Sequence, residues 1–156
     1  MSTVIIYSTR HGATRKCAEL LKFKLFGAVL ADLKENPEFD FSGYDAVIIG
    51  GSVQAGSVKR NLKKFCEKNK KELLKKKLGL FICCMYEGRE AEEQIKKNFP
   101  GELFERACAK DYFGGIFDFN KMNFLERFII KQAVKVKESV YKIKEERITS
   151  FAEKFK

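Results

Sequence analysis

Short, uninterrupted apolar runs alternate with longer segments of helical periodicity, and this alternation constrains the fold more than any other feature. The runs at 4–7, 46–51 and 78–84 lack polar alternation, which is typical of strands covered on both faces. Strands are also expected at 28–33 and within 107–115, a turn region at 36–43, and a turn or short helix at 100–105. Helices are expected over residues 12–26, 58–74, 90–98, 123–137 and 145–156. The pattern predicts an α/β fold, a doubly wound parallel sheet with helices on both faces and right-handed crossovers.

The chain length and the absence of linkers favour a single domain over residues 1–156. No apolar run approaches the roughly 18 residues that a membrane span requires. The first residues lack the basic region and cleavage site of a signal peptide, so we expect a cytoplasmic protein. Five cysteines without metal-type spacing are then expected to be reduced, buried and hydrophobic in character.

The chain is basic, with 31 Lys and Arg against 21 Asp and Glu and a formal net charge of +10. Much of the excess lies between residues 59 and 77. An acidic protein, an anionic membrane surface, a nucleic acid or an anionic small molecule would each be attracted by such charge. A solvated helix face rich in lysine explains the same residues without any partner.

The segment between the first expected strand and the first expected helix has the composition of a phosphate-binding loop. Residues 8–14 contain three hydroxyl side chains, Gly12 and Arg10, directly before a helix N-terminus. The Gly-Lys-Ser/Thr ending of a Walker loop and the repeated glycines of a dinucleotide fingerprint are both absent. An ordinary strand–helix turn capped by Thr is the alternative. His11, the one histidine, could add positive charge or simply face water.

The same segment resembles the flavodoxin signature. The positions that this signature constrains are all met, by Ile5, Ile6, Tyr7, Thr9, Gly12, Thr14, Ala18 and Leu21. The resemblance implies a flavodoxin-like five-stranded sheet of order 2-1-3-4-5 and the cofactor FMN. It also implies that the hydroxyl groups of Thr9 and Thr14 and the N–H groups of residues 10–14 surround the FMN phosphate.

Two further loops are implied to flank the flavin ring. The loop at 52–57 would border the ring, and Gly56 would permit the peptide rearrangement that accompanies flavin reduction in the family. After the fourth strand, Tyr86 is the expected stacking residue, since the chain has no Trp. The cofactor-binding residues expected from the resemblance are Ser8, Thr9, Arg10, His11, Gly12, Ala13, Thr14, Ser52, Val53, Gln54, Ala55, Gly56, Cys84, Met85, Tyr86 and Gly88. Neither catalytic residues nor a metal-ligand cluster can be named from the sequence.

The segment 114–131 resembles the menaquinone-dependent protoporphyrinogen dehydrogenase type of flavodoxin-domain protein. A Gly-Gly pair is followed by an aromatic-rich connection and by a basic apolar helix at 123–137. This resemblance implies an FMN-dependent oxidoreductase of haem biosynthesis, with a quinone as acceptor. The basic helix could lie on the inner face of an anionic membrane or simply cover the sheet.

The sequence is therefore compatible with three functions. The first is an FMN oxidoreductase of the protoporphyrinogen dehydrogenase type, which passes electrons from a substrate to a quinone or another acceptor. The second is a flavodoxin-like electron carrier that works with an acidic redox partner protein and has no substrate of its own. The third is a binding module without redox activity, although no interleaved aromatic and basic motif indicates nucleic acid.

Overall fold

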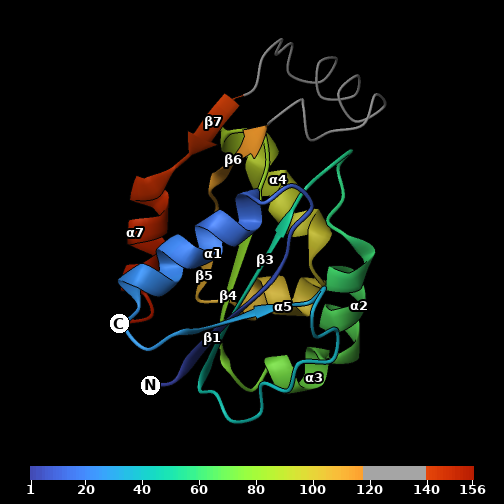
Figure 1. The fold of residues 1–156 in the computed structure, drawn as a ribbon. Helices are drawn as coiled ribbons and strands as arrows, with labels where there is room; N and C mark the ends of the chain where they lie inside the picture. Colours follow the sequence, from blue (N-terminus) through green and yellow to red (C-terminus); the bar gives the residue numbers. More distant parts are fainter. Residues whose placement is uncertain (118–139) are drawn as a thin grey trace.

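A five-stranded parallel sheet forms the centre of the computed structural model, which describes residues 1–117 and 140–156 (Figure 1). Its strands are β1 (Thr3–Ser8), β2 (Val29–Asp32), β3 (Ala46–Ser52), β4 (Lys77–Cys83) and β5 (Ala109–Tyr112). They lie in the order β2-β1-β3-β4-β5, and every neighbouring pair is parallel. The apolar runs therefore form strands as expected, and the predicted flavodoxin-like order is confirmed.

Helices cover both faces of this sheet (Figure 1). On one face pack α1 (Ala13–Lys24) and α7 (Glu145–Glu153). The other face is covered by α2 (Arg60–Lys68), α3 (Lys70–Leu73), α4 (Gly88–Asn98) and α5 (Gly101–Arg106). Because successive side chains of a strand point to opposite faces, each central strand contributes to two separate hydrophobic clusters.

Aromatic rings fill the cluster beneath α1 and α7. The ring of Phe81 stacks on that of Phe113, with centroids 4.8 Å apart, and both meet Phe151 edge-on. Neighbouring strands provide room for these rings by carrying glycine. A Cβ added to Gly50 would lie 2.0 Å from the Phe81 ring, and one added to Gly79 would lie 2.6 Å from Phe155. The position of the rings thus depends on glycines in the strands beside them.

Three expected elements differ from the structure. The helix expected over 58–74 is broken at Asn69, whose side-chain amide donates to the carbonyl of Phe65 at 2.9 Å. The strand expected within 107–115 is divided at Phe113. Its second half, β6 (Gly114–Phe117), pairs antiparallel with β7 (Val140–Ile143), a pairing that the sequence did not indicate. The last helix ends at Glu153 instead of residue 156.

The helix expected at 123–137 lies outside the described residues, so the idea that it binds a membrane stays a prediction. Within the ranges 1–117 and 140–156, no helix has both the length and the apolar character needed to span a bilayer.

Four of the five cysteines are buried, but Cys108 is exposed, which corrects the expectation that all five are buried. We expect a thiol reagent such as DTNB to modify Cys108 rapidly in the native protein. The other four should react at least roughly a hundredfold more slowly, because a buried thiol reacts only after local opening. Burial also raises the pKa of Cys66 and of Cys84 to about 12. Counting fast and slow thiols, with Cys108→Ser as control, checks this expectation; fast reaction in that variant would contradict it.

Candidate functional site

The carboxyl ends of β1, β3 and β4 meet at one edge of the sheet. Ser8 lies beside Gly51, and Ser52 lies beside Cys83, in the registers of these strands. The chain leaves β1 towards β2 on one side and returns to β3 on the other, so the strand order reverses between β1 and β3. A crevice for ligands is expected at such a point in an open α/β sheet. Here the loops at 8–14 and 52–57, both predicted to bind the cofactor, come together.

The segment that joins β1 to α1 is shaped to receive an anion. Gly12 precedes the helix with φ of +97°, and its N–H donates to the Thr9 hydroxyl oxygen at 3.0 Å. Gly12 is the N-cap residue of α1 and has no side chain with which to cap the first N–H groups of the helix. The first N–H groups of a helix have no intrahelical acceptor and carry the positive end of the helix dipole. The Thr9 hydroxyl keeps its own proton to donate, so the donor set fits a phosphate group.

Thr14 is placed differently from Thr9. Its side chain is fully buried, and its hydroxyl lies 2.5 Å from that of Ser52. This contact joins the start of α1 to the end of β3 across the point where the strand order reverses. Thr14 thus links the two loops, while Thr9 presents its hydroxyl at the half-exposed surface.

The start of α2, with the N-cap residue Lys59 before it, also contacts this loop. The Ser8 hydroxyl donates to Asn61 at 2.7 Å, and the Lys59 ammonium lies 3.5 Å from the Thr9 carbonyl oxygen. The sequence did not single out Lys59 or Asn61, since their distance along the chain from the loop gives no signal. The contact also places a cation next to the anion-binding segment.

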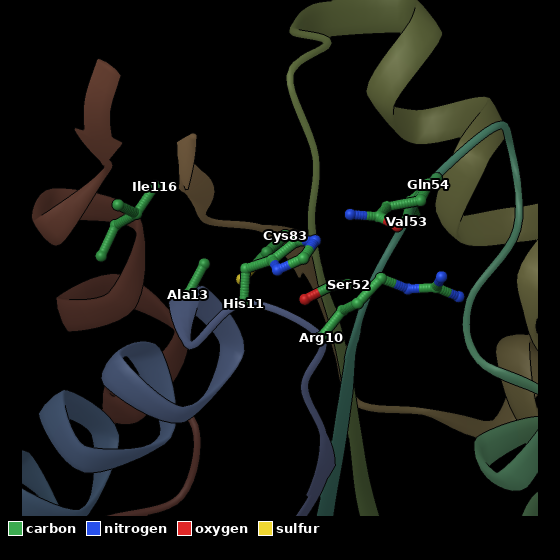
Figure 2. Close-up of a pocket in the computed structure, with 8 residues that line it drawn as sticks. All are labelled: Arg10, His11, Ala13, Ser52, Val53, Gln54, Cys83 and Ile116. Atoms are coloured by element: carbon green, nitrogen blue, oxygen red, sulfur yellow. The ribbon is translucent and has the colours of Figure 1, made fainter. Parts of the chain in front are cut away.

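A recess of about 300 Å³, part of it open to solvent, lies beside these loops (Figure 2). It is lined by the loop between β1 and α1 with the start of α1, by the end of β3 with the turn that follows, by the end of β4, and by β6. The lining residues are Arg10, His11, Ala13, Ser52, Val53, Gln54, Cys83 and Ile116. Six of these eight were expected from the sequence, whereas Cys83 and Ile116 were not.

The loop at 52–57 closes into a tight turn at the rim of the recess. Gln54 and Ser57 exchange backbone hydrogen bonds of 2.9 and 3.0 Å. Ala55 and Gly56 occupy the two central positions with φ of +50° and +81°. On the entry side, the Val53 N–H donates to the Cys83 carbonyl at 2.9 Å, which fixes the turn to β4.

The residues expected from the loop after β4 do not line the recess. Cys84 belongs to the cluster on the α2–α5 face, and half-buried Tyr86 packs against that cluster. Met85 is also half-buried, and the Gly88 N–H donates to the Tyr112 hydroxyl at 3.0 Å. Cys83 lines the recess in place of Cys84, because adjacent residues of a strand point to opposite faces. Flavin contacts by Cys84, Met85, Tyr86 and Gly88 stay predictions.

Cys83 meets a second thiol beneath the recess. Its sulfur lies 3.5 Å from that of Cys17 on α1. The hydrogen bond with Cys17, followed by burial, raises the pKa of Cys83 well above its ordinary value, and a weaker bond with Thr14 opposes this. The thiol is therefore protonated at neutral pH, and we assign it a packing role.

Ile116 lies on β6, and the pairing of β6 with β7 helps to place it at the recess. Gly114, with φ of +74°, begins β6, and its carbonyl accepts from the Cys84 N–H at 3.0 Å. A Cβ at this position would lie 1.8 Å from the Lys142 carbonyl oxygen, so the pairing with β7 requires glycine. The exposed carboxylate of Glu87 pairs with Lys144, just beyond β7, at 2.5 Å, and this lowers the pKa of Glu87. These bonds hold the β6–β7 pair against the end of β4.

Among residues 1–117 and 140–156, no group of three or more His, Cys, Asp or Glu side chains could hold a metal ion. The donors gathered at the site are hydroxyl and backbone N–H groups. Beside them, Val53 and Cys83 form an apolar wall of the recess. Such a set suits a phosphorylated, flat organic ligand better than a metal.

The chain matches a family model described as flavodoxin domain over residues 4–142. Among solved structures, oxidised flavodoxin 2 from Bacillus cereus is 20% identical, with a TM-score of 0.60 over 99% of this chain and 97% of that one. A short-chain flavodoxin associated with a bacterial microcompartment is 13% identical, with a TM-score of 0.63 over 98% and 95%. Rubredoxin oxygen:oxidoreductase from Desulfovibrio gigas is 14% identical, with a TM-score of 0.52 over 97% of this chain and 34% of that one. No curated protein is significantly similar in sequence.

Proposed function

The chain belongs to the flavodoxin domain family, its cofactor is accordingly FMN, and on this premise we propose that it is an electron-transfer protein that exchanges electrons with a redox partner protein. FMN, when bound, supplies the ability to take up and release one or two electrons. The observation that carries the proposal is that three features meet where the strand order reverses between β1 and β3. They are the N-terminus of α1, whose N-cap residue is glycine, the Thr9 hydroxyl, and a recess lined in part by apolar side chains. The protein residues bind and orient the cofactor.

The two parts of the site have separate tasks. The N–H groups at the start of α1, with the Thr9 hydroxyl, hold the phosphate. The turn at 54–57 and the wall formed by Val53 and Cys83 hold the ring and limit the access of water. A purified sample mixed with FMN should quench the flavin fluorescence and release FMN on denaturation. If saturating FMN shows no binding, the proposal is wrong.

A basic helix surface lies next to this site and favours an acidic partner. Arg60 and Lys64, one turn apart on α2, are both exposed. The same helix contacts the cofactor-binding loop through Asn61 and Lys59. Electrostatic attraction would therefore guide an acidic protein to the edge where the flavin is bound, which is the arrangement that electron transfer needs.

We expect Arg60→Glu/Lys64→Glu to slow electron exchange with an acidic electron-transfer protein of the ferredoxin type by about tenfold or more at low salt. Attraction between exposed charges is screened within about 8 Å at physiological ionic strength, so the difference should shrink as salt rises. Stopped-flow measurement of flavin reduction across a salt series checks this.

The matched control is Lys71→Glu/Lys77→Glu, which changes the net charge equally. Lys71 lies in α3 and Lys77 begins β4, at the end of the sheet opposite to the carboxyl ends of its strands (Figure 1). Equal slowing in both variants would show that overall charge matters and that the α2 surface is not the docking site.

The finer proposal, a protoporphyrinogen dehydrogenase, rests on the resemblance of residues 114–131. Most of that segment lies outside the described residues. Anaerobic mixing of the FMN-loaded protein with protoporphyrinogen separates the two functions. Rapid bleaching of the flavin would favour the dehydrogenase, and no bleaching would favour the electron carrier.

A further inference from the structure

The side-chain amide of Asn98, the last residue of α4, holds the turn that borders the recess. Its oxygen accepts from the Val58 N–H at 3.0 Å, and its nitrogen donates to the Gly56 carbonyl at 3.1 Å. These two bonds fix the exit side of the turn, as the bond from Val53 to Cys83 fixes its entry. The turn is therefore held from α4 and from β4 at once.

The amide has little freedom to move. Asn98 is 5% exposed, and its nitrogen also donates to the Gln94 carbonyl of the same helix at 2.8 Å. Both donor hydrogens and the acceptor oxygen are thus engaged. A buried amide with all its partners in place keeps a single orientation, because any rotation would leave polar groups unpaired.

The turn needs such support. Among the residues that the structure describes, Ala55 is the one residue other than glycine with a positive φ, a conformation disfavoured for side chains with a Cβ. Strain of this kind persists where surrounding contacts determine the backbone. Here Asn98 supplies those contacts without itself lining the recess.

We propose that Asn98 is a positioning residue for the flavin, which holds the Gly56 carbonyl away from the recess and thereby favours the oxidised over the reduced cofactor. The proposal rests on the proposed function, since it requires FMN beside the turn. Oxidised flavin presents a bare acceptor nitrogen, N5, at the edge of its ring system, whereas reduced flavin carries a proton there and becomes a donor. A carbonyl free to turn towards the ring would accept from that N–H and stabilise the reduced form. A carbonyl held by Asn98 gives no such bond.

The test compares Asn98→Ser with the wild-type protein. Serine near the end of a helix can still donate to the carbonyl four residues before it, so the bond to Gln94 is kept while both bonds to the turn are lost. We expect the ratio of the Kd for oxidised FMN to the Kd for reduced FMN to rise about tenfold, as one neutral hydrogen bond allows. This ratio corresponds to a rise of about 30 mV in the two-electron midpoint potential of the bound flavin.

A second measurement needs no cofactor. In the ligand-free variant, the N–H groups of Ser57 and Val58 should exchange with deuterium faster than in the wild-type protein, because the turn has lost its exit contacts. The matched control is Asn69→Ser just after α2, where the side-chain amide makes the same bond to the carbonyl four residues earlier but does not hold the turn at 54–57. Asn69→Ser should leave unchanged both the midpoint potential of the bound flavin and the deuterium exchange of the Ser57 and Val58 N–H groups.

The outcomes separate the two proposals. Wild-type protein that fails to bind FMN would overturn both. Wild-type protein that binds FMN, with an unchanged Kd ratio in a folded Asn98→Ser variant, would overturn the role of Asn98 alone. An equal shift in Asn69→Ser would also overturn it, because the effect would then reflect loss of helix-end stability.

Discussion

Thr9→Val should raise the Kd for FMN by roughly 10- to 150-fold and leave the Kd for riboflavin almost unchanged. The substitution removes a hydroxyl that can donate to the phosphate, with little change in volume. A hydrogen bond to a charged group contributes about 1.5–3 kcal/mol, which gives this range. Riboflavin lacks the phosphate, so its binding does not depend on that bond. Titration by fluorescence quenching with both ligands measures the two constants.

Thr9→Ser is the matched control, because it keeps the hydroxyl that accepts from the Gly12 N–H. We expect its affinity for FMN to lie within about threefold of the wild-type value, since the charge-assisted bond is retained. Equal weakening of FMN and riboflavin by Thr9→Val would contradict the phosphate role and indicate a general disturbance of the loop.

Gly50→Ala should lower the free energy of unfolding by about 3 kcal/mol, which is at the upper end of the destabilisation caused by an overpacked core. The new Cβ would lie 2.0 Å from the Phe81 ring, which is fully buried and stacked on Phe113. The ring cannot move away without disturbing that stack. For a chain of this size, such a loss lowers the melting temperature by roughly 6–12 °C. Denaturant and thermal unfolding measure both quantities.

Two further variants test the cause of that loss. Gly43→Ala, where a Cβ would meet nothing within 4 Å, should change stability by less than about 0.5 kcal/mol. In a Phe81→Leu background, Gly50→Ala should be at least about 1 kcal/mol less destabilising than alone, because the clashing ring is absent. Strict additivity of the two substitutions would contradict the steric explanation.

The strands and the anion-binding loop could be predicted from the sequence because their signals are local. A strand buried on both faces needs an uninterrupted apolar run, as at residues 46–51, whatever packs against it. The loop signal is equally local, since Thr9 and Gly12 lie three residues apart and bond to each other. The resemblance carried by the same residues then gave the sheet order, which the structure confirms.

The residues that hold the loops of the site in place could not be predicted, because they lie far from those loops in the sequence. Asn98 contacts a turn about 40 residues earlier, and Asn61 reaches Ser8 across 53 residues. Neither asparagine belongs to a local pattern. Ile116 lines the recess because β6 pairs with a strand that begins at residue 140. No local sequence pattern near residue 116 predicts this pairing.

The sequence by itself determined that β4 is a buried strand, and only the tertiary structure decided whether Cys83, its last residue, or Cys84, the next residue, reaches the site. In a strand with one solvent-exposed face, polar and apolar residues alternate, and this alternation shows which residues point to the core. β4 is apolar on both sides, so its residues do not show which side meets α1 and α7 and which meets α2–α5. Packing of Phe81 against Phe113 and Phe151 fixes that choice, and it turns Cys83 towards the recess and Cys84 away from it.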